Sequence, residues 1–201
     1  MPAIRKVSRD DIVNAALQVL REHGFSAVNA RSVAQTLGCS TQPIYRVFGN
    51  MDELKTEMAS RAVQEHTRRI SEAVRSNHGS RSRYCDYGFG FVRFAEQEKQ
   101  LFRWLYLEDG QGIHRLDDVH APEIIATIMD EYGYTKEIAE KLHRDMTYYS
   151  YGIAVLANTG TLSLSDEELL DAFRREFALL ANNYGLPPKK HVASPDHPSS
   201  R

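Results

Sequence analysis

The chain has 201 residues, of which 42% are hydrophobic and 26% are charged, and its formal net charge at pH 7 is −2. This apolar content is enough for a buried core and excludes a chain that is disordered throughout. The small net charge argues against a protein that coats nucleic acid indiscriminately, but the charge is uneven, since residues 1–50 sum to +3 and the remainder to −5. A basic N-terminal part on an acidic body suits contact with DNA at one end only.

Two cysteines, Cys39 and Cys85, are too few for a disulfide framework, and Cys39 is interpreted as a small buried residue rather than a redox switch. The chain has no run of 18 apolar residues and no N-terminus of the signal-peptide type. We therefore expect a cytoplasmic protein that does not associate with membranes.

The first helix is expected to begin at Ser8, because Asp11 three residues later allows a capping box. Gly24 is expected to end it, since glycine readily takes the left-handed conformation that closes many helices. Between these points the apolar residues fall on one stripe at helical spacing, formed by Ile12, Ala16, Val19 and Leu20.

Residues 29–54 are typical of two short helices, a tight turn and the start of a third helix. Val33, Ala34 and Leu37 recur at helical spacing, and Gly38 stands where a left-handed residue can end one helix. Ser40 then caps the next helix. This pattern is that of a helix-turn-helix unit.

With Ser40 as the N-cap, Thr41, Gln42 and Pro43 occupy the first turn of the second short helix, where proline is tolerated. A recognition helix enters the major groove of DNA by its N-terminal end. The hydroxyl of Thr41 and the amide of Gln42 are therefore the groups best placed to meet base edges.

The remainder of this short helix divides into an inward and an outward side. Ile44, Val47 and Phe48 are expected to point inward. Tyr45 and Arg46 lie on the other side, where a phenol and a guanidinium can donate to phosphate oxygens.

The same residues resemble a known family. The run Gly38-Cys39-Ser40-x-x-x-Ile44-Tyr45-x-x-Phe48-x-Asn50-x-x-x-Leu54, preceded by Arg31-x-Val33-Ala34 and Gly24-Phe25, is similar to the N-terminal domain of TetR-type transcriptional regulators (TetR/AcrR family). The similarity covers roughly residues 8–55.

This resemblance implies an all-helical, homodimeric regulator, a repressor that responds to a ligand and binds a palindromic operator in double-stranded DNA. By position, Arg31 matches a residue that in some members reaches a base or a phosphate. Thr41 and Gln42 match base-reading positions, and Tyr45 matches a phosphate-contacting tyrosine.

Two positions depart from the family pattern. The family usually has lysine directly after the position of Asn50, whereas this chain has Met51, and it often has His or Tyr where this chain has Val47. Lys55, one turn beyond Met51, is the residue expected to replace part of the lost phosphate contact.

Residues 50–74 keep helical apolar spacing and predict a long helix that joins the DNA-binding part to the rest. A polar loop at 77–83 separates it from two aromatic helical segments, at 84–98 and 101–107. Residues 109–122 are expected to form an irregular loop.

Several histidines and carboxylates in this half of the chain were weighed as metal ligands. His114, Asp117, Asp118 and His120 have no defined helical spacing, so a solvated acidic loop is favoured over a metal site. The pair Glu140-x-x-His143 has the spacing of half a di-iron motif without its second half, and is interpreted as an exposed helix face. We expect no metal and no cofactor.

Three further helices are expected at 123–132, 138–157 and 165–184, the last capped by Ser165 with Glu168. The last two helices carry long apolar stripes, more apolar surface than a thin body layer needs, and are expected to form the homodimer interface. No stretch alternates as a half-buried strand does, so the fold is predicted to be all-α.

The chain is divided into a DNA-binding domain at 1–50, a regulatory and dimerisation domain at 51–186 and a disordered tail at 187–201. A largely apolar or aromatic effector is expected in the second domain, although any single aromatic residue there is more often part of an ordinary core. The candidate pocket residues are Tyr87, Phe91, Phe94, Phe102, Trp104, Met146 and Tyr149.

Two other functions were compared with the DNA-binding regulator. A helical dimer that senses a ligand or partner but binds DNA weakly is favoured only by Met51. A helical-bundle enzyme is not supported, since no nucleophile, base and orienting group can be placed together from the spacings of its histidines and carboxylates.

Overall fold

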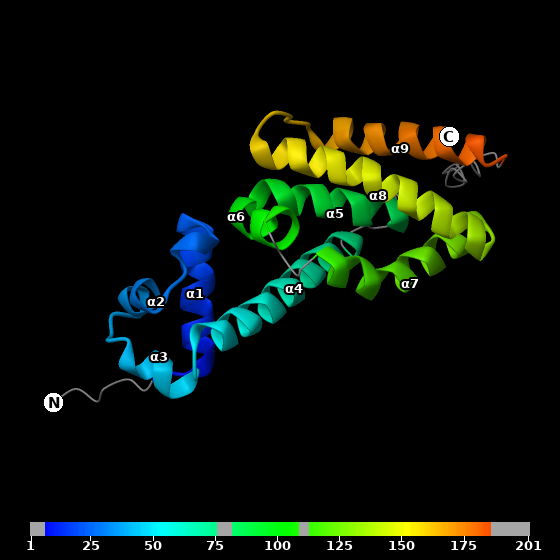
Figure 1. Cartoon of the computed structure of the whole chain (residues 1–201). Coiled ribbons are helices and arrows are strands. Elements are labelled where there is room, and N and C mark those ends of the chain that lie inside the picture. Colours follow the sequence, from blue (N-terminus) through cyan, green and yellow to red (C-terminus); the bar gives the residue numbers. More distant parts are fainter. Residues whose placement is uncertain (1–6, 76–81, 109–112, 186–201) are drawn as a thin grey trace, which may run out of the picture.

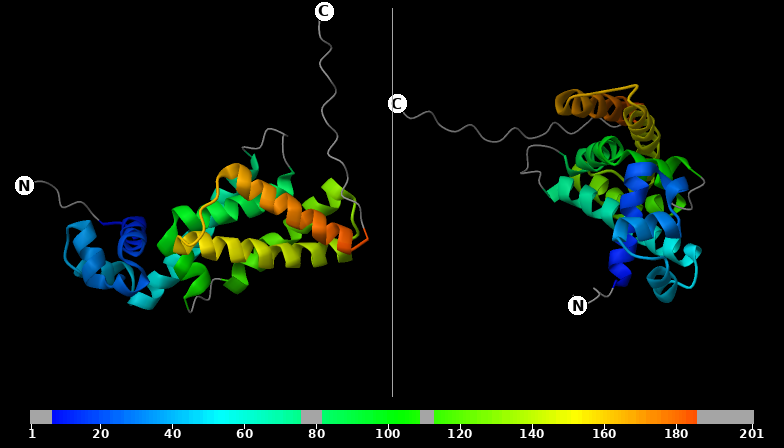
Figure 2. Two further views of the ribbon diagram at one scale, coloured as in Figure 1. Left: turned by 90° about the horizontal axis from the view of Figure 1, so that it is seen from above. Right: turned by 90° about the vertical axis from the view of Figure 1, so that its left-hand side faces the viewer.

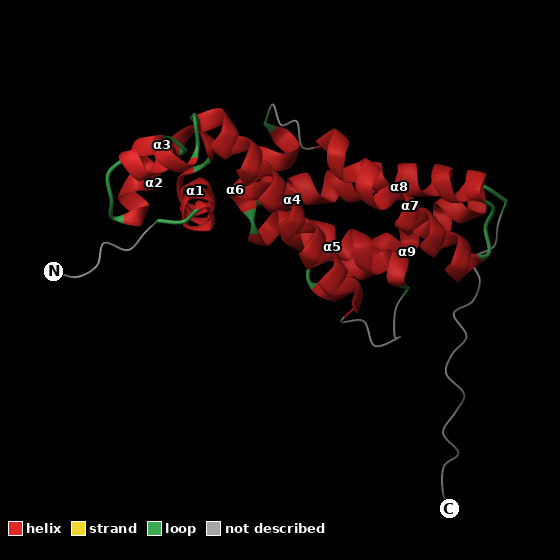
Figure 3. Ribbon diagram, turned by 90° about the horizontal axis from the view of Figure 1, so that it is seen from below, coloured by secondary structure: helices red, strands yellow, loops and turns green. Residues whose placement is uncertain are grey.

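The computed structural model describes residues 7–75, 82–108 and 113–185, with backbone only for residues 113–120. Every regular element in these ranges is a helix and none is a strand (Figure 3). The predicted all-α fold class is therefore confirmed.

The chain forms an N-terminal group of short helices, called the head, and a larger helical group, called the body (Figure 1). The head consists of α1 (Arg9–His23), the 3₁₀ turn η1 (Phe25–Ala27), α2 (Ala30–Leu37) and α3 (Gln42–Val47). The long helix α4 (Met51–Arg75) leaves the head and runs into the body. The body comprises α5 (Arg83–Gln97), α6 (Lys99–Phe102), the π-helical turn η2 (Arg103–Leu107), α7 (Ile113–Tyr132), α8 (Lys136–Thr159) and α9 (Asp166–Asn183).

Three of the caps expected in the head, at Ser8, Gly24 and Gly38, are formed. Ser8 and Asp11 exchange the two hydrogen bonds of a capping box at the start of α1. Gly24 ends α1 with φ of 82° and Gly38 ends α2 with φ of 65°, conformations that strain any residue with a Cβ atom. These caps fix where each short helix starts and stops, and hence how α2 and α3 meet.

The start of α4 is held by hydrogen bonds to two side chains. Asn50 accepts a hydrogen bond from the N–H of Glu53 at 2.9 Å. The Glu53 carboxylate accepts from the N–H of Gly49 at 2.9 Å. The acidic side chain thus holds the turn between α3 and α4 as well as the helix N-terminus.

Two local predictions are wrong. The residue flanking α3 is Thr41, in a helical conformation and without a side-chain capping bond, so Ser40 does not cap the helix. The loop expected at 109–122 is also too long, because α7 begins at Ile113 and passes through Pro122. A proline removes one backbone hydrogen bond from a helix, and here the helix continues through it.

The body is built around α5, which packs on α4 on one side and on α8 on the other. The close approach of α4 depends on Gly90, where a Cβ atom would lie 3.2 Å from Cβ of Ala73. Helices α8 and α9 lie side by side along the outside of the body, at the end of the chain (Figures 1 and 2). Each therefore has one face turned away from the core.

The interpretation of Glu140-x-x-His143 as an exposed face holds for Glu140 but is wrong for His143. The imidazole of His143 is half-buried against Tyr84, with their rings at 6.1 Å and the phenol oxygen 3.5 Å from Nδ1. This burial lowers the pKa of His143.

Candidate DNA-binding surface and the connection to the body

Helix α3 presents a polar face to solvent and an apolar face to the head, as its sequence indicated. Ile44 and Phe48 are buried in the head core, whereas Gln42, Tyr45 and Arg46 are exposed. Tyr45 is 53% exposed, although its side chain is large and mainly apolar. The groups that can meet base edges and phosphates thus lie together on one side of α3.

The remaining predicted contact residues of the head are at least partly exposed. Thr41 and Pro43, at the start of α3, are partly exposed, and Ser40 before them is exposed. Arg31, in the first turn of α2, is also exposed.

The arginines of the head differ in whether their charge is already neutralised. Arg9 and Arg21 are held in ion pairs. Arg31 and Arg46 make no ion pair with any residue that the structure describes. Since a guanidinium already paired within the protein is less available to a phosphate, Arg31 and Arg46 are the head arginines with charge to offer DNA.

Arg9 positions α3 relative to α4. Its guanidinium lies 4.1 Å above the Phe48 ring and donates to the carbonyl of Val47 at the end of α3. The same group pairs with Glu53 and Glu57 of α4, at 3.1 and 3.0 Å. One side chain thereby contacts the end of the candidate reader helix and the start of the helix that enters the body.

Met51 stands where the family usually has lysine, and Lys55 is the residue expected to replace part of the lost phosphate contact. Both side chains are partly buried against the protein. The ammonium of Lys55 is 3.7 Å from Asp52 and lies 5.5 Å from the Phe25 ring centre. Met51 is partly buried against the head core. A phosphate contact by Lys55 would require it to leave Phe25.

An aromatic stack and an ion network join the head to the body. Phe25, just after α1, stacks on Trp104 of η2 with ring centres 5.0 Å apart and planes inclined by 18°. Trp104 was expected in a ligand pocket, and the structure places it at this junction, 9% exposed.

The ion network, which we call the junction network, consists of Arg21, Glu65, Arg69 and Glu98. Arg21 of α1 pairs with Glu65 at 2.6 Å and with Glu98 at 2.9 Å. Arg69 pairs with the same two carboxylates, at 3.3 and 2.5 Å. Burial alone would raise the pKa of Glu65, but hydrogen bonds and charges from Arg21 and Arg69 outweigh it and hold the pKa below its ordinary value.

Three of the candidate pocket residues meet in the body, in what we call the central aromatic cluster. Its members are Phe91, Phe94, Phe102, Tyr106, Tyr151 and His66, with each ring 4.7–6.4 Å from a neighbouring ring. The other candidates lie apart from the cluster. Tyr87 donates to Glu123 at 3.1 Å, Tyr149 packs on Phe173, and Met146 is buried in the core.

Half of the central aromatic cluster was missed from the sequence. His66 of α4 is buried, and its Nε2 is 3.0 Å from the hydroxyl of Tyr106. Tyr151 donates to the carbonyl of Tyr106 at 2.7 Å. The signal for His66 was its position four residues after Ala62 and four before Ile70, both of which are buried on the same stripe of α4.

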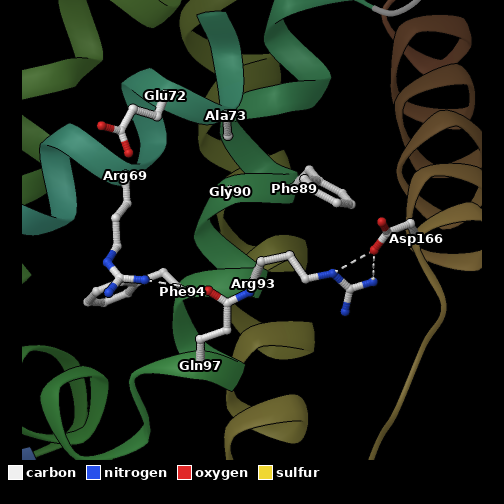
Figure 4. Close-up of a pocket in the computed structure, with 9 residues that line it drawn as sticks. All are labelled: Arg69, Glu72, Ala73, Phe89, Gly90, Arg93, Phe94, Gln97 and Asp166. Carbon is white, nitrogen blue, oxygen red and sulfur yellow. Dashed lines mark hydrogen bonds and ion pairs between the residues drawn. The ribbon is translucent and has the colours of Figure 1, made fainter. Parts of the chain in front are cut away.

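An open cleft of about 330 Å³ lies between the C-terminal half of α4, α5 and the start of α9, and we call it the α4–α5 cleft (Figure 4). Its floor includes the small residues Ala73 and Gly90, and the Phe89 ring stands on the side towards α9. Arg69 and Arg93 line it from opposite sides.

Among the residues that the structure describes with side chains, no three His, Cys, Asp or Glu residues come together as a metal site would require. The proposed ligands His114, Asp117, Asp118 and His120 lie outside those residues. No helix in the same described part combines the length and apolar composition needed to cross a bilayer.

The short capped helices, the exposed polar face of α3 and the buried Ile44 and Phe48 define the class of the protein, which is that of helix-turn-helix DNA-binding proteins. Residues 12–58 match the family model described as "Bacterial regulatory proteins, tetR family". Residues 12–58 therefore resemble the N-terminal domain of tetR-family regulators, and the chain as a whole shares the fold of the solved structures that follow.

Several solved structures share the fold over most of their length. A TetR family member from Streptomyces coelicolor A3 is 14% identical, with 84% of this chain and 96% of that chain aligned and a TM-score of 0.62. A transcriptional regulator from Rhodococcus sp. Rha1 is 20% identical over 88% and 97% of the two chains, with a TM-score of 0.57. The multidrug binding protein EbrR, in complex with imidazole, is 14% identical over 84% and 93%, with a TM-score of 0.56. Comparison with curated protein sequences gives no significant match.

Proposed function

We propose that the protein is a ligand-responsive transcriptional repressor that binds a palindromic operator as a homodimer. The observation that carries this proposal is the start of α3, where the partly exposed Thr41 and the exposed Gln42 adjoin the exposed Tyr45 and Arg46. Arg46 and Arg31, which is exposed in the first turn of α2, pair with no carboxylate among the described residues. Gln42 can make a bidentate contact with adenine, and the arginines can neutralise phosphates on either side.

The homodimer is supported by the exposed apolar residues of α8 and α9. Tyr148 is 69% exposed, Leu179 is 66% exposed and Leu156 is 43% exposed, all on the two helices along the outside of the body. Large apolar side chains at this exposure are typical of a surface that a partner covers. An isologous contact of α8 and α9 with the same helices of a second copy would bury them in a four-helix arrangement.

Response to a ligand is supported by the central aromatic cluster and by the fold shared with a multidrug binding protein. A ligand in the body changes operator affinity only if it prefers one arrangement of the heads over another. Helix α4, the Phe25–Trp104 stack and the junction network are the contacts through which such a preference would reach the head.

The proposal is tested by selecting bound sequences from a random DNA pool with the full-length protein. We expect two inverted half-sites whose centres are about one helical turn, 10–10.5 base pairs, or a multiple apart. A Tyr45→Phe variant serves as the matched control, because losing one phosphate contact weakens binding without changing the selected sequence. An unenriched pool, or a single half-site, contradicts the proposal.

A second candidate function, a dimeric sensor of a ligand or partner with weakened DNA binding, is favoured by Met51 and by the position of Lys55 over Phe25. One missing phosphate contact costs about 1 kcal/mol, which reduces operator affinity without abolishing it. Gel shifts with genomic fragments at several salt concentrations separate the two candidates, since a sensor without an operator binds all fragments alike.

A further inference from the structure

We propose that the α4–α5 cleft binds a small molecule with an aromatic ring and a carboxylate, and that Arg69 links this site to the head through the junction network. The cleft has a volume of about 330 Å³, at the lower end of the range for small-molecule sites. It lies between α4, α5 and the start of α9 (Figure 4) and borders the central aromatic cluster through the buried Phe94, which belongs to both.

The lining of the cleft selects the apolar half of the ligand. Ala73 and Gly90 form a closed floor where α4 and α5 meet, because a Cβ atom on Gly90 would lie only 3.2 Å from Cβ of Ala73. The Phe89 ring forms the side towards α9, with the guanidinium of Arg93 5.3 Å from its centre. A second ring placed over Ala73 and Gly90 would meet Phe89 at its edge or offset, the arrangements that aromatic pairs prefer.

The guanidiniums of Arg69 and Arg93 differ in how many close hydrogen bonds they already make within the protein. Arg93 donates to Asp166 at 2.7 and 3.0 Å and to the carbonyl of Leu164 at 2.9 Å. Arg69 has one close partner, Glu98 at 2.5 Å, while its contacts with Glu65 are 3.3 and 3.4 Å and its contact with Gln97 is 3.5 Å.

Charge-assisted hydrogen bonds of guanidinium to carboxylate are normally about 2.7–2.9 Å long. Most of the contacts of Arg69 are longer than this, so a carboxylate in the cleft can improve on them, whereas one at Arg93 cannot. The side chain of Arg69 is also more open, 31% exposed against 16% for Arg93. Arg69 is therefore the residue that takes the anion.

Arg69 shares its carboxylate partners with the head. Glu65 and Glu98 are divided between Arg69 of α4 and Arg21 of α1. When a ligand carboxylate binds Arg69 and draws it away from Glu65 and Glu98, Arg21 is the remaining arginine that pairs with these two carboxylates. The head is then held more tightly against the body, next to the Phe25–Trp104 stack.

Binding is tested by titration calorimetry with 3-phenylpropanoate and, as the uncharged match, 3-phenylpropan-1-ol. We expect the acid to bind at least about tenfold more tightly than the alcohol, since one charge-assisted pair separates them. Arg69→Gln should lower the affinity for the acid by a similar factor and leave the affinity for the alcohol unchanged. Arg75→Gln is the matched control, because Arg75 is an exposed arginine of the same helix outside the cleft.

If Arg69→Gln does not fold, Arg69→Lys takes its place, because it keeps the charge but loses the fork that binds a carboxylate at two points. It should also weaken binding of the acid. Equal binding of acid and alcohol, an unchanged affinity in the Arg69 variants, or no binding of the acid at millimolar concentration overturns the site.

The link to the head is tested by the fluorescence of Trp104, the single tryptophan of the chain. Neither probe absorbs at 295 nm, so the emission of Trp104 can be followed during the titration. We expect saturating acid to shift this emission in the native protein and not in Arg21→Gln, which binds the acid more weakly because Arg69 alone then pairs with Glu65 and Glu98. A shift that persists in Arg21→Gln, or no shift in the native protein, overturns the link.

The effect on an operator rests on the function proposed above, but neither measurement contains DNA. If the acid does not bind, the proposed DNA binding is unaffected. If no operator is found, calorimetry still decides whether the cleft binds the acid.

Discussion

Asn158 joins α8 to the end of α5 and to α6, and its replacement tests how strongly the body depends on one polar side chain. The residue is 1% exposed. Its amide nitrogen donates to the carbonyls of Ala95 at 2.8 Å and Lys99 at 3.1 Å, and its oxygen accepts from Nε of Arg103 at 3.1 Å. Ala95 lies in the last turn of α5, where carbonyls lack partners within the helix.

Asn158→Leu keeps the approximate volume of the side chain and removes all three hydrogen bonds. The buried carbonyl of Ala95 then loses its side-chain partner, at a cost of about 1–3 kcal/mol, and the partly buried carbonyl of Lys99 adds less. Arg103 is partly exposed and can turn to water. The free energy of unfolding should fall by about 2–4 kcal/mol, and the melting temperature by about 2–4 °C for each kcal/mol.

The measurement is urea and thermal unfolding followed by circular dichroism, at one protein concentration because subunit association changes apparent stability. The control is Glu140→Gln, an isosteric change at an exposed residue of the same helix whose one ion pair, with Lys136, is exposed and 3.7 Å long, and which should stay within about 0.5 kcal/mol. A loss below about 1 kcal/mol for Asn158→Leu would show that the two carbonyls do not depend on this amide.

Four further outcomes are expected. Gln42→Ala should relax base preference at one or two positions of each half-site, with a loss of about 1–3 kcal/mol of discrimination, seen by repeating the pool selection. Arg46→Gln should make the salt dependence of operator binding shallower by about 2 in a dimer, since each copy loses one phosphate contact, seen by gel shifts from low to high salt. Because burial lowers the pKa of His143 from its ordinary 6.5, stability present above pH 6.5 should be lost as the pH falls below it, and His143→Gln should remove this part of the loss in thermal scans at pH 7.5 and 5.5. Leu179→Glu should give monomers in sedimentation velocity, while Leu107→Glu, also exposed but outside α8 and α9, should not.

The parts of the fold that could be predicted are those fixed by neighbouring residues. The capping box of Ser8 and Asp11 and the left-handed Gly38 need only contacts a few residues apart, and both formed where the sequence placed them. The stripe of α4 was equally clear, because the helical period is set by the backbone. Within this stripe His66 was overlooked, since a histidine is not apolar although its partners bury it.

The start of α3 shows the limit of such local signals. Ser40 has the composition of an N-cap, yet the turn after Gly38 places the helix one residue later, with Thr41 at its start. Helix α7 shows the opposite error, since Pro122 was taken as the end of a loop and lies inside a helix. In both cases the path of the chain around the residue, rather than its propensity, determines the outcome.

The candidate pocket could not be assembled from the sequence, because its members meet only through contacts between distant helices. Phe91 and Phe102 do meet. Trp104, two residues after Phe102, points elsewhere and stacks on Phe25, 79 positions before it in the chain. Aromatic composition indicates a core, whereas the π-helical turn at Trp104 sets which aromatic side chains face the cluster and which face the head.

The net charge of the head, counted from the sequence, likewise differs from the charge that its structure leaves available to DNA. Counted from the sequence, residues 1–50 carry +3, which suggests a broadly basic surface. In the structure Arg9 and Arg21 are paired with carboxylates of α4 and with Glu98, so their charges hold the head together and hold it to the body. What remains for DNA among the described arginines of the head is concentrated at Arg31, in the first turn of α2, and Arg46, in the last turn of α3. A surface with few, well-placed cations binds DNA weakly when the bases do not match, because phosphate contacts supply most of the non-specific affinity. The neutralised arginines thus serve specificity indirectly: they remove positive charge from the sequence-independent contact while fixing the orientation of the helix that can read bases.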